Sequence, residues 1–336
     1  MQAEWHSATG NTRRMVAEGG IVETFLSAES TMVILFIIVG CGFFARKMKW
    51  TDDRFDAGLT KLIMSISCPA LILDSVLGNT NLPDAAFILN ILLISVVTYI
   101  PILLVAWIAP KLYRAPRESQ GAHQFTIAFG NTGFIGFAVV GAIIGSNAVL
   151  YASMYNIIFN VVIFSVGAMF VASAGTVKVS MREHVYKVLA QLRSPAMIAC
   201  FLALVLALLG ITDNDGIIGR TCDMLGAMTP PASMLVIGST LAKYHFKDML
   251  GNWRIYPTAL LRLLGVPAIF WFVGGLITSD SYLLGVLALE SAMPAAALGT
   301  MFCLTYGGDL KTMSQGMFVT TIFSVITIPL VTLALF

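Results

Sequence analysis

Residues 129–145 read "FGNTGFIGFAVVGAIIG", which places five glycines and one asparagine inside an otherwise apolar stretch of helical length. A glycine in a helix interior costs roughly 1 kcal/mol relative to alanine. Gly130, Gly133 and Gly136 surround Asn131, so the pattern predicts a weakened or broken helix at that residue. Close packing against a neighbouring helix is the alternative explanation, because Gly141 and Gly145 form a GxxxG spacing.

The surrounding composition is that of an integral membrane protein. Of the 336 residues, 57% are hydrophobic and 11% are charged, whereas soluble domains average roughly 25% charged residues. The lipid bilayer is therefore the first expected partner. The 20 basic residues nearly balance the 18 acidic ones, so the charge gives no indication of nucleic acid as a partner.

A helix needs about 20 apolar residues to cross a bilayer, and ten stretches of suitable length lie between charged or turn-rich breaks. The predicted spans are 27–44, 58–77, 86–109, 121–145, 148–173, 195–211, 218–242, 254–277, 281–305 and 314–335.

Basic residues alternate between successive loops. Fifteen lie in the loops after the odd-numbered spans and one, Arg220, in the loops after the even-numbered ones. Because Lys and Arg near helix ends stay in the cytoplasm, the odd loops are predicted inside and both termini outside the cell (inner) membrane. Arg13 and Arg14 favour the opposite orientation and resemble a twin-arginine signal, but no AxA-type cleavage site follows, so a retained first helix is expected.

The longest inside connection divides the spans into two sets of five. Because five is odd, a second five-helix unit enters the membrane in the opposite orientation, as in many secondary transporters. The predicted fold is all-α, with ten transmembrane helices as two inverted five-helix repeats. The organisation is an extracytoplasmic tail (1–26), a first repeat (27–173), a cytoplasmic loop (174–194) and a second repeat (195–336). Pro69 and Pro231, and likewise Asn147 and Asp309, lie 162 positions apart, which agrees with a repeat.

Two polar residues are predicted near the bilayer midplane, in equivalent spans of the two halves. Asn131 lies roughly 15 Å into the fourth span, and Glu290 lies roughly 14 Å into the ninth from the opposite side. A charged group at that depth costs about 2.5–3.5 kcal/mol, and Pro294 removes a backbone donor nearby. Broken helices at this level expose N–H groups suited to a carboxylate and carbonyls suited to a cation.

The candidate site follows from these two breaks. Glu290 and Asp74 are the candidate ion-coupling residues, for H⁺ or for Na⁺ at Glu290. Pro69, Pro231 and Pro294 are the candidate helix-breaking prolines. The candidate substrate-binding residues are Asn131, Thr132, Gly133, Gly136, Phe137, Ser291, Pro294 and Ala295.

Simpler roles are open for several of these residues. Glu290 could be a protonated structural group, and Asp74 could be a solvated residue at a helix end. Arg262, eight residues into its span, could extend to the inside interface instead of facing a cavity. Pro69 and Pro231 are expected to shape helices rather than to touch substrate. The five cysteines lack CxxC or His/Cys clustering and are expected to be small core residues, with no resident metal or cofactor.

At these residues the sequence resembles the auxin efflux carrier family, which includes plant PIN-formed carriers and many bacterial permeases. The similar stretches are "CPALIL", "NTGFIG", "PPASMLVIGSTLA" and "ESAMPAAALGTMFCLTYGGDLKTMSQGMFVTTIFSVITIPLVTL", in that order along the chain. The resemblance implies broken fourth and ninth helices that cross at the substrate site, a fold shared with bile acid sodium symporters. It also implies transport of small carboxylates such as auxins, malate or malonate.

The resemblance carries over to particular positions, with one departure. It implies that Asn131 and Pro294 lie at the crossing, and that Glu290 occupies the place of a sodium-ligating glutamate in bile acid symporters. Family members commonly have a proline where this chain has Phe137, so the break in the fourth helix is expected to depend on glycine.

The expected function is secondary active transport of a small organic anion by alternating access. A channel or a non-transporting sensor is the alternative. An intramembrane enzyme is not expected, because HExxH and GxSxG are absent and "YGGD" at 306–309 does not match GxGD. The apolar surface is equally compatible with a monomer and a homodimer.

Overall fold

The computed structural model describes residues 20–79, 82–174, 193–213, 215–243 and 246–335. This part of the chain folds into helices, with one isolated β-bridge between Gly130 and Ala295. Most of the predicted N-terminal tail and of the predicted cytoplasmic loop at 174–194 lies outside the described residues.

The first half of the chain contains five helical segments, some built from more than one helix. Asp52 and Asp84 begin α3 and α5 by accepting hydrogen bonds from the backbone N–H groups of Phe55 and Phe87, both at 2.7 Å; such N-caps satisfy donors that lack an intrahelical partner. The elements are α2 (Gly20–Lys47), α3 (Asp53–Leu62), η1 (Ile63–Ser67), α4 (Cys68–Leu77), α5 (Ala85–Leu112), α6 (Arg117–Ala128), η2 (Thr132–Gly136), α7 (Phe137–Ile143), α8 (Ser146–Val162), η3 (Ile163–Gly167) and α9 (Ala168–Ala174), where η denotes a short π-helix.

The second half follows the same order of segments. Ser194 caps the first helix through Met197 N–H, and Gly210 ends it in the left-handed conformation, with φ 68°. The elements are α11 (Pro195–Leu209), α12 (Ile217–Gly226), α13 (Thr229–Leu241), α14 (Phe246–Leu250), α15 (Ile255–Leu260), η4 (Leu261–Gly265), α16 (Val266–Gly275), α17 (Ser281–Ser291), α18 (Leu298–Tyr306) and α19 (Leu310–Leu335).

Each of the ten predicted spans overlaps helical segments of the structure. By length and composition, six helices of the described chain could cross a membrane: Asp53–Leu77, Ala85–Leu112, Ser146–Ser173, Ile217–Leu241, Ile255–Gly275 and Leu310–Leu335. The fourth and ninth predicted spans are interrupted, between Ala128 and Thr132 and between Ser291 and Leu298. The interruptions lie where glycine and proline predicted them.

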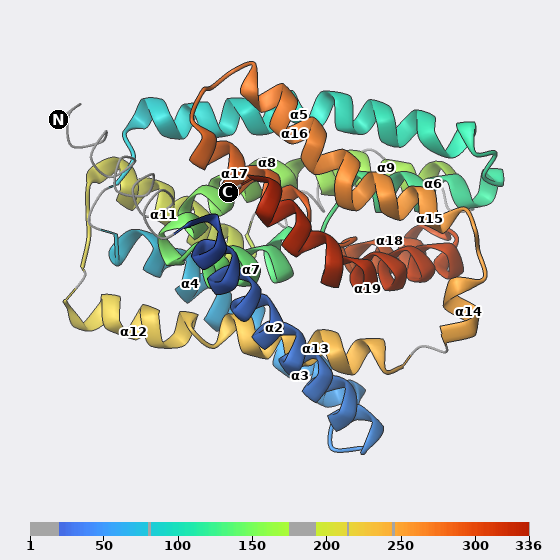
Figure 1. The fold of residues 1–336 in the computed structure, drawn as a ribbon, viewed down its shortest axis with the longest axis horizontal. Helices are drawn as coiled ribbons and strands as arrows, with labels where there is room; N and C mark the ends of the chain where they lie inside the picture. Colours follow the sequence, from blue (N-terminus) through green and yellow to red (C-terminus); the bar gives the residue numbers. More distant parts are fainter. Residues whose placement is uncertain (1–19, 80–81, 175–192, 214, 244–245, 336) are drawn as a thin grey trace.

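The helices form two groups. The first group contains α2, α3–α4, α11 and α12–α13, and the second contains the remaining segments. In Figure 1, α2 crosses α13 in the lower part of the view, while α5 and α16 run along the top. Gly42 and Gly238 allow α2 and α13 to approach closely, because a Cβ at either position would overlap the backbone of the other helix.

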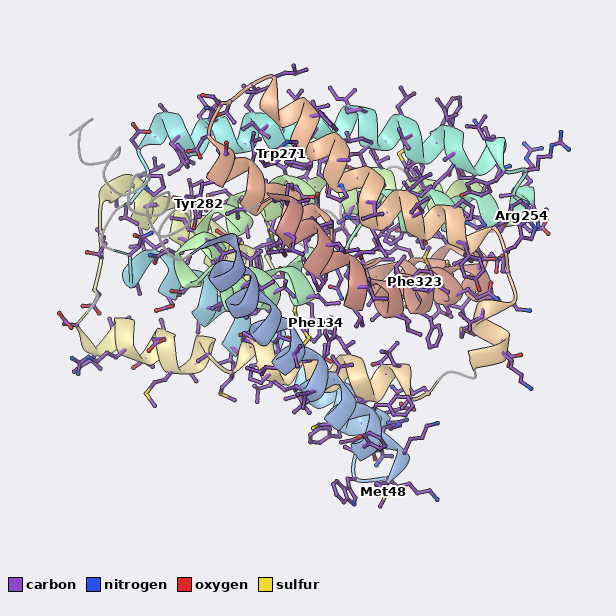
Figure 2. All side chains as sticks on the ribbon, viewed as in Figure 1. Met48, Phe134, Arg254, Trp271, Tyr282 and Phe323 are labelled. Atoms are coloured by element: carbon purple, nitrogen blue, oxygen red, sulfur yellow. The ribbon has the colours of Figure 1, made fainter. Side chains whose placement is uncertain are left out.

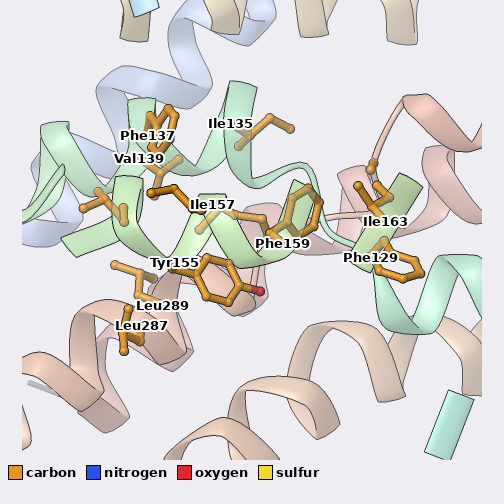
Figure 3. Packing of buried hydrophobic residues seen from close by; sticks show 14 of the residues in the cluster. Phe129, Ile135, Phe137, Val139, Tyr155, Ile157, Phe159, Ile163, Leu287 and Leu289 are labelled. Atoms are coloured by element: carbon orange, nitrogen blue, oxygen red, sulfur yellow. The ribbon is translucent and has the colours of Figure 1, made fainter. Parts of the chain in front are cut away.

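Aromatic side chains fill the second group beside the interrupted helices. Figure 3 shows Phe129, Tyr155 and Phe159 close together in this core. The Phe129 and Phe159 ring centroids are 6.1 Å apart, and the Tyr99 and Tyr155 hydroxyls share a 2.8 Å hydrogen bond. This packing holds the break next to Phe129 against α5 and α8.

The outward surface is rich in apolar side chains, as a bilayer requires. Leu104, Trp107 and Phe272 are all more than half exposed. Figure 2 shows side chains projecting from the outer faces of the helices, with labelled Arg254 at one end of the long axis. Water could not solvate such a surface at low cost.

Candidate functional site

The two interrupted helices cross and are joined by backbone hydrogen bonds. Asn131 N–H donates to the carbonyl oxygen of Pro294 at 2.7 Å, and Ala296 N–H donates to that of Phe129 at 3.0 Å. These bonds flank the antiparallel bridge between Gly130 and Ala295. The extended residues of each interrupted helix therefore provide hydrogen-bond partners for backbone groups of the other. Backbone groups inside a membrane need such partners, because no water is available there.

The break in the first of these helices does not require a proline at position 137. Phe137 lies beyond the break, at the start of α7, and its backbone N–H donates to the carbonyl of Thr132 within the π-helical turn. The extended residues lie upstream, where Gly130 has no room for a side chain: a Cβ there would be 2.8 Å from Arg262 Nη2 and 2.9 Å from the Met293 carbonyl oxygen. Glycine is the residue that permits the close approach at the crossing.

A cavity of about 540 Å³ adjoins the crossing. The start of η2 and the chain leading into α18 both line it, so the N-terminal ends of two half-helices meet at one space. None of its lining residues in the described chain is Lys, Arg, His, Asp or Glu. Of the predicted substrate residues, those lining the cavity are Asn131, Thr132, Gly133, Phe137 and Ala295.

The other predicted substrate residues lie near the cavity but do not line it. Pro294 supplies the carbonyl that pairs with Asn131. Ser291 is fully buried, and its hydroxyl donates to the Ala288 carbonyl at 2.7 Å. Gly136 faces Glu290, because a Cβ on Gly136 would overlap both carboxylate oxygens.

Glu290 is completely buried directly behind the π-helix η2. Asn156 Nδ2 donates to Glu290 Oε1 at 3.2 Å, while Oε2 has no hydrogen-bond partner among the described residues. An ionised carboxylate in such a place is costly unless a cation or another donor satisfies it. The geometry leaves one carboxylate oxygen available for a proton or a cation.

The sequence did not single out two asparagines of α8 that belong to this site. Asn156 contacts both Glu290 and Thr132, whose hydroxyl donates to Asn156 Oδ1 at 3.4 Å. Asn160 Nδ2 donates to the Asn156 carbonyl at 2.8 Å, and both asparagines line the cavity. The signal was available, because asparagines four positions apart share one face of an apolar helix.

Asp74 and the two remaining prolines lie away from the cavity. Asp74 is buried near the end of α4. Pro69 and Pro231 occupy the first turns of α4 and α13, directly after a π-helix and a turn respectively. None of the three lines the cavity.

Arg262 neither extends to the interface nor lines the cavity; it is 1% exposed and lies beneath the crossing. Its Nε and Nη1 donate to the carbonyl oxygens of Met293 and Ile127, each at 3.0 Å, and its Nη2 donates to the Ser291 carbonyl. One guanidinium thus caps the C-terminal ends of α6 and α17. The position of Arg262, eight residues into its predicted span, could not indicate this role, because depth along a helix does not tell which way the side chain points.

Discontinuous helices that cross beside a cavity, within a helical protein with an apolar surface, are typical of membrane transport proteins. Residues 28–332 match the family model described as membrane transport protein. The chain belongs to this family, which is that of the auxin efflux carriers.

Curated relatives agree with this assignment across nearly their whole length. An uncharacterized transporter of Methanocaldococcus jannaschii is 24% identical, covering 89% of this chain and 96% of the relative. One of Methanothermobacter thermautotrophicus is 23% identical, covering 91% and 98%. The uncharacterized transporter YfdV of Escherichia coli K12 is 22% identical, covering 91% and 96%.

Proposed function

We propose that this protein is a secondary active transporter that carries a small organic carboxylate across the cytoplasmic membrane by alternating access. The observation that carries the proposal is the convergence of two half-helix N-terminal ends on one cavity. Such ends carry partial positive charge and unpaired N–H groups, which suit a carboxylate. Asn131 and Thr132 add side-chain hydrogen-bonding groups on the same wall.

The order of elements supports a build of ten transmembrane segments in two inverted halves. Each segment of the first half has a counterpart: α2 with α11, α3–α4 with α12–α13, α5 with α15–α16, α6 with α17, η2–α7 with α18, and α8–α9 with α19. Ser67 and Thr229 share a 2.5 Å hydrogen bond and are 162 positions apart. That is also the spacing of Pro69 and Pro231, as expected where two related segments meet near a pseudo-two-fold axis.

The distribution of basic loops favours an inward-facing state. The connections α5–α6 and α14–α15, both predicted inside, lie at the right-hand end of the view in Figure 1. The cavity is lined by the N-cap and first residue of α11, Ser194 and Pro195, and by the last turn of α13, Thr240 and Leu241. Both are predicted inside ends, so the cavity opens toward the cytoplasm under this orientation.

Glu290 is the group best placed to couple transport to a cation. Its unpartnered Oε2 could take up a proton, or Na⁺ together with oxygens of Asn156 or Thr132. Neutralising Glu290 removes a negative charge from beside the proposed anion site, which favours anion binding. The proposed coupling is therefore symport, with cation and carboxylate bound together.

Uptake into proteoliposomes tests the function. Mono- and dicarboxylates are compared under separately imposed sodium and pH gradients, with electrical recording in parallel. Wild-type protein is expected to show saturable flux driven by one of the two gradients. The double variant Glu290→Gln, Asn131→Ala is expected to lose that flux. Equal flux in wild type and double variant for every ligand would refute the site, and currents far above carrier turnover would indicate a channel instead.

A further inference from the structure

Arg262 is a buried cation whose partners are carbonyl oxygens rather than carboxylates. It forms no ion pair among the described residues. Two of its acceptors, Ile127 and Ser291, lie in the last turns of α6 and α17, and the third, Met293, lies just beyond α17. Each helix C-terminus carries a partial charge of about −0.5. The two ends together match the single positive charge of one guanidinium.

The partial positive charges of the helix N-terminal ends lie on the cavity side of the crossing. The N-terminal ends of η2–α7 and of α18 each carry a partial charge of about +0.5, and no charged side chain lines the cavity in the described chain. One negative charge in the cavity would balance these two ends, just as Arg262 balances the other two.

We propose that Arg262 is a positioning residue that sets the charge of the transported substrate at minus one. With Glu290 neutralised by its coupling cation, as proposed above, and the C-terminal ends neutralised by Arg262, the two N-terminal ends determine the potential in the cavity. A monoanion completes the balance, whereas the second charge of a dianion finds no cationic side chain. This inference rests on the proposed transport of carboxylates and specifies which of them the site accepts.

The guanidinium is close enough to act on the cavity. Gly130 lines the cavity on one side, and a Cβ on Gly130 would be 2.8 Å from Arg262 Nη2 on the other. One backbone segment therefore separates the charge from the proposed substrate. A charge at this range, away from water, is screened little by salt.

A charge series on one carbon skeleton tests the inference in the wild-type protein. A dicarboxylic acid, its monomethyl ester and its dimethyl ester present two, one and no negative charges with similar shapes. Competition against a transported carboxylate measures the affinity of each. The monoester is expected to bind at least about tenfold more tightly than the diacid or the diester, because an unbalanced charge in the cavity is costly. Equal or tighter binding of the dianion would overturn the inference.

Substitutions of Arg262 test whether this residue is the cause. Arg262→Met removes the charge and keeps a side chain of similar length, whereas Arg262→Lys retains the charge. Arg254→Met is the control, because Arg254 lies at the N-terminal end of α15, outside the crossing. Arg262→Met is expected to reduce the preference for monoester over diester at least about tenfold, while Arg262→Lys and Arg254→Met retain it. An unchanged preference in Arg262→Met would overturn the inference, and thermal melting in detergent monitors folding.

The experiment separates failure of this inference from failure of the proposed function. If the wild type neither binds nor moves any carboxylate, the proposed function fails. If the wild type transports carboxylates without preference for the monoanion, the function stands and the role of Arg262 is refuted. If Arg262→Met does not fold, the wild-type charge series and Arg262→Lys still decide the outcome.

Discussion

Glu290 has one hydrogen-bond donor, Asn156, and one oxygen without a partner among the described residues. Replacing Glu290 by Gln keeps the size and removes the charge that would attract a coupling cation. We therefore expect Glu290→Gln to exchange substrate across the membrane while losing accumulation driven by a sodium or proton gradient. Counterflow and gradient-driven uptake in proteoliposomes measure the two activities separately.

Glu118→Gln is the matched control for Glu290→Gln, because Glu118 is exposed in the first turn of α6, the N-terminal part of the same interrupted helix as η2. It should retain both exchange and accumulation. Gradient-driven accumulation by Glu290→Gln at the wild-type level would remove Glu290 from the coupling mechanism.

Gly136 is the residue that makes room for Glu290. A methyl group on Gly136 would overlap both carboxylate oxygens, so Gly136→Ala must displace either η2 or the acid. We expect Gly136→Ala to reduce gradient-driven transport strongly and to lower the melting temperature, since overpacking of a buried site typically costs about 1–3 kcal/mol.

Gly58→Ala tests whether the effect belongs to this position. Gly58 lies in α3, where a Cβ would meet no atom within 4 Å, so the substitution should leave transport unchanged. Wild-type transport by Gly136→Ala would mean that the contact with Glu290 is not required.

At the scale of elements, a charge cluster joins α2, α3 and the end of α13. Lys243 Nζ is 2.7 Å from Asp53 Oδ1 and 3.2 Å from Asp56 Oδ2, and Arg46 contacts both aspartates. The Asp53 side chain is 76% exposed, whereas that of Asp56 is 7% exposed and also accepts a hydrogen bond from Ser239.

Burial, rather than contact distance, should decide which aspartate contributes more to stability. Breaking a buried ion pair costs about 3–5 kcal/mol, and exposed pairs contribute little. We expect Asp56→Asn to lower the melting temperature clearly and Asp53→Asn to change it little, although Asp53 makes the shorter contact. Thermal melting of the two purified variants compares them directly, and a larger loss in Asp53→Asn would contradict the argument.

The crossing of the two interrupted helices was predicted in part from the sequence. Glycine and proline spacing predicted interruptions at the correct level of both helices, because local helix propensity is a property of sequence. The π-helix Thr132–Gly136 and the backbone pairing of Asn131 with Pro294 were not predicted. Both depend on two segments about 160 residues apart meeting at one angle, which no local pattern specifies.

At the scale of the whole molecule, the cavity should be reached from the cytoplasm. In a cysteine-free background, Thr240→Cys places a thiol on the cavity wall. We expect a membrane-impermeant maleimide to label it faster from the inside, with protection by a bound carboxylate. Asp215→Cys is the control, because the Asp215 side chain is 98% exposed in a loop predicted outside. Faster labelling of Thr240→Cys from outside would reverse the proposed orientation.

The structure places the predicted site residues in two different environments. Asn131, Thr132 and Ala295 line the cavity, whereas Ser291 and Gly136 face the protein behind it. Sequence spacing gives only the position of a residue along its helix axis. The direction in which a side chain points depends on how each helix is rotated against its neighbours.

Hydropathy, glycine and proline spacing and charge along the chain were enough to predict the membrane class, the helical segments, the positions of the two breaks and the asymmetry of the basic loops. These are one-dimensional quantities, since hydropathy, helix propensity and depth are read along the chain. The tertiary structure decided that Asn156 meets Glu290, that Gly136 admits the carboxylate, and that Arg262 caps two helix ends. Those contacts join residues more than 100 positions apart, or two helices through one side chain, so packing alone could select them.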